Sequence, residues 1–166
     1  QGHRPTNEDA HLIDAETLGE GHVIAAIFDG HAGPDAAIFV SENLVRILST
    51  DTHWIEYSNL PNQKSKSKNV EMVKKALMET FQKLDDELHN SDQVQYGIDN
   101  SGCTAVFCII TPSHIICASV GDSRAVVMTK SEDDVHATPL TDDHKPQNKL
   151  EKKRICDAGG FVYMER

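Results

Sequence analysis

The segment His22-Val23-Ile24-Ala25-Ala26-Ile27-Phe28, followed by Asp29-Gly30-His31, decides how the rest of the chain is interpreted. Its apolar run is typical of a buried β-strand, and the polar residues follow where the strand ends. Carboxylate and carbonyl oxygens are the ligands that Mg²⁺ and Mn²⁺ prefer, and a glycine carbonyl can turn toward an ion because no Cβ blocks it. The pattern indicates a metal-binding strand end with His31 nearby as a proton donor. A tight strand-to-helix turn with solvated polar residues is the alternative.

Further polar side chains open the chain. Glu8 and Asp9 are adjacent acids, which on a strand would point to opposite faces. One of them could contact a metal while the other orients a metal-bound water. Arg4 carries a planar fork of donors that matches two oxygens of a phosphate. A solvated strand edge is the alternative interpretation of this segment.

Two stretches have the apolar spacing of amphipathic helices. The first runs from Pro34 to Ser49, and the second runs from Asn69, as the capping residue, to about Asn90. Both patterns predict core packing without catalytic content. The residues between them, 51–68, contain asparagine, proline, serine and alternating lysines, so they are predicted to form an exposed, mobile connection.

The second half of the chain is rich in β-forming residues. Runs at 103–110 and 114–120 are joined by Thr111-Pro112-Ser113, which is a hairpin signal, and a third run follows at 124–129. Three such strands in succession predict antiparallel pairing, with Asp122 at a second hairpin turn. An aspartate at a turn usually binds its own backbone, and a role in binding a cation is the alternative.

Strands and helices cluster along the sequence without strict alternation. A helix at 148–158, stopped by Gly159-Gly160, and a strand at 161–166 follow the β-rich region. This order favours an α+β or layered sandwich fold over a doubly wound parallel sheet. At 166 residues, the chain is expected to be one domain or part of one.

Composition and charge narrow the functional class. A formal net charge of −10 argues against a nucleic-acid or anionic-membrane surface, since both need basic patches. The sequence contains no HExxH pattern and no paired Cys/His spacing, so a zinc site is not indicated. Four cysteines without a CxxC pair suggest an intracellular protein. No apolar run reaches transmembrane length, and the opening residues do not resemble a signal peptide.

Five ordered blocks of the chain resemble the metal-dependent serine/threonine protein phosphatases of the PPM, or 2C, family. Together they span almost the whole sequence, which makes the resemblance far more specific than any single block. The blocks are Arg4 with Asn7-Glu8-Asp9-Ala10-His11, Phe28-Asp29-Gly30-His31, residues 101–106, residues 120–126, and Asp143-His144-Lys145-Pro146 with Glu151, Arg154 and Ala158-Gly159-Gly160.

The resemblance implies a central β-sandwich flanked by pairs of antiparallel helices, with a binuclear Mg²⁺ or Mn²⁺ centre in a cleft at one edge. Carried over by position, Asp29 would bridge both metals and Gly30 would contribute its carbonyl oxygen. Glu8 would hold one metal directly or through water, and Asp9 would order the metal-bound waters. Asp122 matches the family's acid near a third, weaker metal.

The resemblance also implies an activity, namely hydrolysis of phosphoserine and phosphothreonine in proteins by a metal-activated water. Arg4 would bind the substrate phosphate, and His31 would protonate the leaving oxygen. The expected partners are phosphorylated proteins, the expected state is a monomer, and the expected location is the cytoplasm, with the nucleus as an alternative. Two rival functions are a catalytically inactive phosphatase-like binding module and a phosphohydrolase acting on small esters.

The end of the sequence departs from the family pattern. Two further metal-ligating aspartates would follow the strand at 161–166, and early strands would precede Gln1. Residues 1–166 are therefore expected to be the N-terminal portion of a single phosphatase domain. On its own this portion should bind metal weakly, leave part of each sheet open and be inactive. Ala32, where glycine is commoner, and Cys103, where serine or threonine is commoner, are mild departures.

Overall fold

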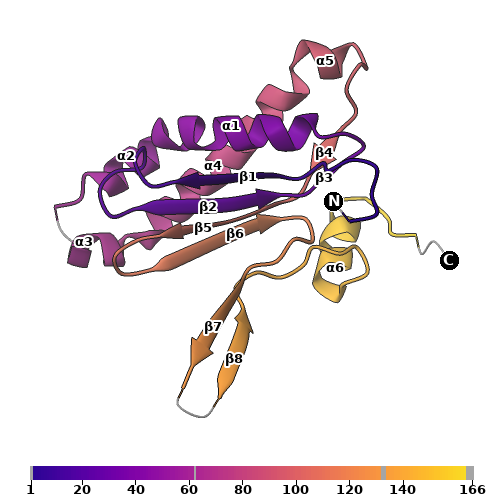
Figure 1. Ribbon diagram of the computed structural model, residues 1–166. Coiled ribbons are helices and arrows are strands. Elements are labelled where there is room, and N and C mark those ends of the chain that lie inside the picture. Colours follow the sequence, from indigo (N-terminus) through magenta and orange to yellow (C-terminus); the bar gives the residue numbers. More distant parts are fainter. Residues whose placement is uncertain (1, 62, 132–133, 164–166) are drawn as a thin grey trace.

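The computed structural model describes residues 2–61, 63–131 and 134–163 of the chain. In this part of the chain the central layer is an antiparallel sheet with helices across one face (Figure 1). The sheet consists, in spatial order, of β1 (Ala10–Asp14), β2 (Val23–Phe28), β5 (Ala105–Ile110) and β6 (Ile115–Val120). The two long helices on that face are α1 (Asp35–Ser49) and α4 (Val70–His89). No helix among these described residues is both long and apolar enough to cross a membrane.

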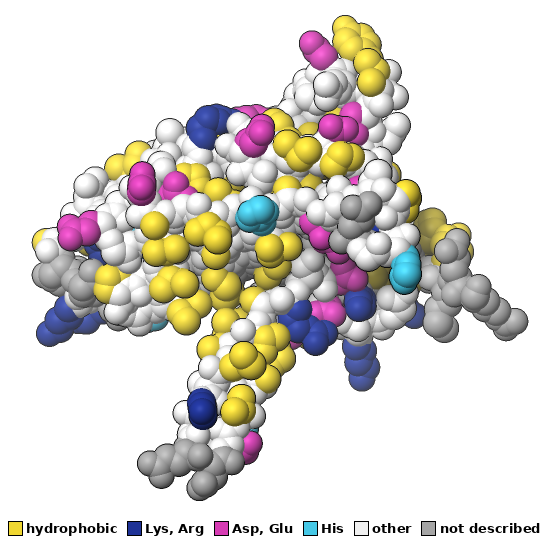
Figure 2. All heavy atoms as spheres, in the orientation of Figure 1, with side chains coloured by type: hydrophobic (Ala, Val, Ile, Leu, Met, Phe, Trp, Pro, Cys, Tyr) yellow, Lys and Arg dark blue, Asp and Glu magenta, His cyan; other side chains and the backbone are white. Residues whose placement is uncertain are grey.

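Strand register assigns each side chain of the sheet to one of its two faces. Leu12, Ala26, Phe107 and Ala118 lie opposite one another across the four strands, and this row contributes to the core under the helices. The adjacent row, which contains Ile13, belongs to the other face because successive side chains alternate. That second face is apolar as well, and no described element covers it. Ile13 is 75% exposed, and Figure 2 shows hydrophobic side chains gathered over the strands there.

The two long helices are antiparallel, as the family resemblance implies. Figure 1 shows the two helices running in opposite directions. One ion pair joins α1 to α4, and two more join α4 to Asp51 and His53, which follow the end of α1. The pairs are Arg46–Glu87 at 2.7 Å, Asp51–Lys83 at 3.8 Å and His53–Glu79 at 3.8 Å. The helical stripes predicted from the sequence are buried here, so the expected helix pair on one sheet is confirmed.

The prediction of an exposed connection at 51–68 is wrong in part, because Asp51, Trp54 and Tyr57 are buried, and its mobility stays a prediction. Its described residues form α2 (Thr52–Ser58) and α3 (Gln63–Lys68). The Asp51 carboxylate accepts hydrogen bonds from the backbone N–H groups of His53 and Trp54 at 2.9 and 3.1 Å, which caps α2. Trp54 and Tyr57, one turn apart, are 2% and 1% exposed, so apolar burial fixes this helix.

Two smaller predictions also need correction. Asn69 does not cap α4 with its side chain, since its Nδ2 donates to the Ser65 carbonyl at 2.8 Å instead. After α4 the chain forms a short helix, α5 (Asp92–Gln95). Residues 161–163 are not in a strand, and residues 164–166 lie outside the described part. The predicted helix at 148–158 is confirmed as α6 (Lys149–Asp157).

The third β-run does not continue the main sheet. β7 (Val126–Lys130) pairs with β8 (Val135–Pro139), a strand that the sequence reading missed, and this hairpin projects away from β6 (Figure 1). Asp122 is therefore not at a β6–β7 hairpin turn. Contacts with residues beyond β8 hold the chain in its new direction, because Ala125 donates its N–H to Thr141 Oγ1 at 3.0 Å and accepts one from Leu140 at 2.8 Å.

His22 lies in the aromatic cluster that secures α2. Its ring is 1% exposed and makes edge contacts with Trp54 and Tyr57, at centroid distances of 5.5 and 6.0 Å. Nδ1 lies 3.3 Å from the Gly19 carbonyl, while Nε2 has no hydrogen-bond partner among the described residues. Burial lowers the pKa of His22, and the positive charge of Lys66 lowers it further.

We expect this buried histidine to make stability depend on pH. Because its pKa is lowered in the folded state, the unfolded chain binds the proton first. The free energy of unfolding should therefore fall as the pH drops below about 6.5 and level off once the folded ring protonates. Urea unfolding at several pH values, followed by the fluorescence of the single tryptophan, would measure this loss. The variant His22→Gln should lack this part of the pH dependence. If the free energy of unfolding changes equally with pH in both proteins, His22 is not the group responsible.

Candidate active site

One polar cavity collects most of the predicted site residues. It has a volume of about 480 Å³ and lies between the N-terminal segment 4–9 and the turn at residues 29–32. All but one of the predicted residues line it, namely Arg4, Glu8, Asp9, Asp29, Gly30 and His31. Segments separated by about twenty residues in sequence meet here because β1 and β2 pair antiparallel, with Ala10 opposite Phe28.

Gly30 is needed because the backbone of Glu8 packs against it. Gly30 is buried and pairs with Cys103 where β3 (Gly30–His31) meets β4 (Gly102–Cys103). A Cβ atom at Gly30 would lie 2.2 Å from the Glu8 carbonyl oxygen, a distance that real Cβ atoms do not reach. From the sequence, Gly30 is expected to turn its carbonyl toward a metal. The structure adds a steric reason for it, since the close approach brings Glu8 beside Asp29 and His31.

His31 is held by a second glycine. Gly102 lies opposite it in the β3–β4 pair, and a Cβ at Gly102 would come within 2.6 Å of His31 Nε2. The imidazole therefore packs directly against the backbone of β4 while remaining exposed. Ala32, with φ +58°, and Gly33, with φ +131°, then turn the chain into α1.

Thr104, which lies between β4 and β5, positions Asp29 from the neighbouring strand, and the sequence did not single it out. Its N–H donates to the Asp29 carbonyl at 2.9 Å, and its Oγ1 accepts from the Asp29 N–H at 3.4 Å. The same hydroxyl lies 2.6 Å from Ser123 Oγ, beside Asp122. The sequence does contain one indication of this role, because Thr104 places a hydroxyl group within the apolar run at 103–110.

Ser101 supports the site in a similar way. The residue before α1, Pro34, makes no side-chain cap, and Ser101 Oγ instead accepts the Ala36 N–H at 2.9 Å. Because this cap comes from 65 residues further along the chain, local sequence patterns could not reveal it. It fixes the start of α1 directly behind His31.

Asp122 is the one predicted site residue that does not line the cavity. Its carboxylate lies 3.9 Å from Lys145 Nζ, which is also 3.5 Å from Asp143. Arg124 binds Asp143 through two hydrogen bonds of 2.7 and 2.8 Å, and these bonds hold the pKa of the Asp143 carboxyl below its usual value. Lys145 therefore places one positive charge beside the half-exposed Asp122 carboxylate.

The donor chemistry of the cavity suits a hard divalent cation, since it offers carboxylate oxygens and a backbone carbonyl. However, no group of three or more histidine, cysteine, aspartate or glutamate side chains in the described part of the chain could hold a metal ion together. Glu8, Asp9 and Asp29 thus supply part of a ligand set rather than a complete site.

Comparisons with known proteins agree with this arrangement. The family model described as protein phosphatase 2C matches residues 1–166. Protein phosphatase 1B of Rattus norvegicus is 36% identical over 173 residues, covering 100% of this chain and 42% of its own length. Probable protein phosphatase 2C 55 of Oryza sativa subsp. japonica is 37% identical over 164 residues, covering 98% of this chain and 38% of its own.

A solved structure supports the fold. The crystal structure of serine-threonine phosphatase 2C from Toxoplasma gondii matches with a TM-score of 0.83 and 25% identity, over 96% of this chain and 52% of its own. The chain thus spans about half of that structure and 38–42% of the curated relatives named above. With the family model matched from end to end, the chain belongs to the protein phosphatase 2C family.

Proposed function

We propose that residues 1–166 form the N-terminal portion of a single catalytic domain that hydrolyses phosphoserine and phosphothreonine in proteins. The observation that carries this proposal is the polar cavity, in which Arg4 and His31 lie with the acids Glu8 and Asp29. Membership of the protein phosphatase 2C family supports the reaction class. Phosphoproteins are the proposed partners, while the monomeric state and the location inside the cell remain predictions.

Arg4 is the proposed phosphate-binding residue. Its guanidinium carries donors in a fixed plane, so it can bind two phosphate oxygens at once and stabilise the charge that they carry during transfer. It lines the same cavity as the acids, which places a positive group beside several negative ones. This asymmetry would orient a phosphate ester, because the acids repel its oxygens and Arg4 attracts them.

His31 is the proposed general acid. The alkoxide of serine or threonine is a poor leaving group, so a proton delivered to the ester oxygen accelerates cleavage. The ring is exposed in the cavity wall, and the contact with Gly102 restricts its orientation. A positioned imidazole of this kind can both reach the leaving oxygen and exchange its proton with solvent.

Mg²⁺ or Mn²⁺ is the proposed cofactor, in two sites with a third, weaker one. Asp29, the Gly30 carbonyl, Glu8 and Asp9 would hold it, with Asp122 near the third ion. When bound, such ions supply an activated water and neutralise charge on the phosphate. Ionised carboxylates are acceptors only, so without a cation they would repel a phosphate dianion from this cavity.

We expect Mn²⁺-dependent release of phosphate from a phosphothreonine peptide only when the chain is extended to the length of its relatives. The reason is that the described residues lack a complete group of metal ligands. The measurement compares the 166-residue chain with the extended one. Turnover by both would show that the ligand set is already complete. Silence from both, with the extended chain folded and metal-loaded, would favour the binding module instead.

We expect His31→Ala and Asp29→Ala to fail in different ways in the extended chain. His31→Ala should lower kcat for a phosphothreonine peptide by about 10²-fold or more, but should affect p-nitrophenyl phosphate less, because nitrophenolate leaves without a proton. Asp29→Ala should weaken Mn²⁺ binding and activity together. Calorimetric titration with Mn²⁺ and kinetics on both substrates measure these effects. An equal loss of Mn²⁺ affinity in both variants would contradict the separate roles of His31 and Asp29.

A further inference from the structure

Thr104 touches two parts of the chain that carry proposed metal ligands. It lies between β4 and β5, and it holds the Asp29 carbonyl and N–H groups at 2.9 and 3.4 Å. The same hydroxyl lies 2.6 Å from Ser123 Oγ, and Ser123 directly follows Asp122. One threonine therefore stands between the acid proposed to bridge two ions and the acid proposed near a third.

Gly121 contacts the same threonine from the other side of Asp122. In the pairing of β5 with β6, Ala105 lies opposite Val120, so Thr104 and Gly121 are neighbours just beyond these strand ends. A Cβ atom at Gly121 would lie 2.8 Å from Thr104 Cγ2 and 2.9 Å from Thr104 Cβ. The Thr104 side chain therefore meets the residue before Asp122 through its methyl group and the residue after it through its hydroxyl.

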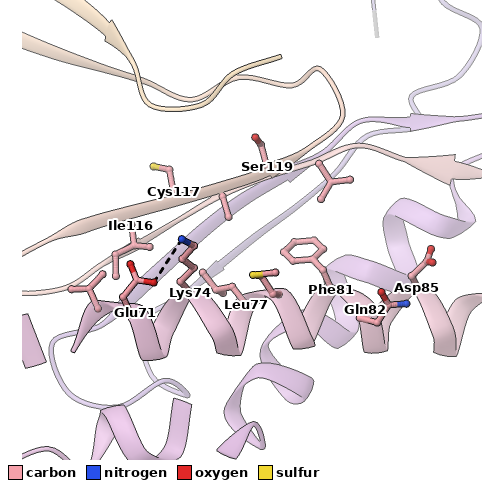
Figure 3. A pocket seen from close by; sticks show the side chains of 13 residues that line it. Glu71, Lys74, Leu77, Phe81, Gln82, Asp85, Ile116, Cys117 and Ser119 are labelled. Carbon is pink, nitrogen blue, oxygen red and sulfur yellow. Dashed lines mark ion pairs between the residues drawn. The ribbon is translucent and has the colours of Figure 1, made fainter. Parts of the chain in front are cut away.

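The segment 121–123 is tied to the scaffold at both ends. It leaves β6, which pairs with β5 along its whole length and lies beside α4 in Figure 3, with Ile116 pointing toward the helix. At the start of the segment, the Gly121 carbonyl also accepts the His144 N–H at 2.8 Å. Because these contacts leave the segment little freedom to absorb a shift of the threonine, such a shift also moves Asp122.

We propose that Thr104 and Ser123 are positioning residues that couple metal binding at Asp29 to metal binding near Asp122. This inference rests on the metal sites of the proposed function, and both partners of every contact belong to this chain. An ion at Asp29 fixes the backbone of that residue, and Thr104 passes the restraint to the segment 121–123. Asp122 then loses less conformational freedom when it binds an ion, so the second binding event is more favourable. By linkage, an ion near Asp122 strengthens binding at Asp29 by the same factor.

Calorimetric titration of the full-length enzyme with Mn²⁺ tests this linkage without depending on turnover. Thr104→Val keeps the branched shape but removes the hydroxyl, and Ser123→Ala removes its partner. Each variant should weaken Mn²⁺ binding at the weaker site about fivefold or more. The double variant should lose no more affinity than the worse single variant, because the shared contact is lost only once. Thr104→Ser keeps the hydroxyl, so it should retain most of the affinity that Thr104→Val loses.

The matched control is Thr111→Val, at the opposite end of β5. Thr111 is 7% exposed, and its hydroxyl also accepts hydrogen bonds, from the N–H groups of Ser113 and His114 at 3.3 and 2.9 Å. The same chemical change is therefore made at the other end of the same strand. Thr111→Val should lower the melting temperature but leave Mn²⁺ affinity unchanged.

Amide hydrogen exchange gives a readout that a merely structural role would not change. Asp122→Asn removes the carboxylate proposed near the third ion but leaves the backbone in place. In this variant, Mg²⁺ bound at Asp29 should still slow exchange in residues 121–125, because the restraint passes through Thr104. Adding Thr104→Val to Asp122→Asn should abolish this protection.

Additive losses of Mn²⁺ affinity in Thr104→Val and Ser123→Ala would overturn the proposal, as would equal losses in Thr104→Val and Thr111→Val. Should Thr104→Val not fold, wild-type Mn²⁺ affinity in Ser123→Ala would overturn it. If the enzyme shows the predicted coupling but releases no phosphate from a phosphothreonine peptide, the proposed reaction fails and the linkage stands. If turnover is present but Mn²⁺ affinity is unchanged in both variants, the linkage fails and the proposed function stands. If the enzyme binds no Mn²⁺, both fail.

Discussion

The close approach of the Glu8 backbone to Gly30 is the constraint on which the site depends. A side chain at Gly30 would lie 2.2 Å from the Glu8 carbonyl oxygen, so only glycine lets the N-terminal segment pass there. The β1–β2 pairing brings the segment to this point, and the contact determines where Arg4 and Glu8 enter the cavity. The polar site at this strand end is thus formed by two segments together, and neither segment could form it alone.

Close backbone packing also holds the turn after β2. Gly102 packs against the His31 ring, and the Thr104 hydroxyl joins the Asp29 backbone to Ser123. Ser101 caps α1 behind them. Short backbone contacts from residues 101–104 therefore hold the reactive turn, and the exposed acids depend on this rigid support rather than on burial of their own.

Sequence reasoning predicted the elements whose patterns are local. The β2 strand and the helices α1 and α4 follow from apolar runs and periodic stripes, and the cavity residues follow from the ordered blocks that resemble the family. It missed α2, because a loop-like composition concealed a buried Trp54 and Tyr57. It misplaced Asp122, because the path of the chain after β6 depends on long-range contacts such as Arg124–Asp143, which no local pattern encodes.

The most direct test is the substitution Gly30→Ala in the full-length enzyme, with phosphothreonine turnover and Mn²⁺ affinity measured together. The added methyl group cannot fit beside the Glu8 carbonyl, so segment 4–9 must move, at a cost of about 2 kcal/mol or more. Both activity and metal affinity should then fall by more than about tenfold. Wild-type turnover and wild-type Mn²⁺ binding in this variant would show that the site does not depend on the contact.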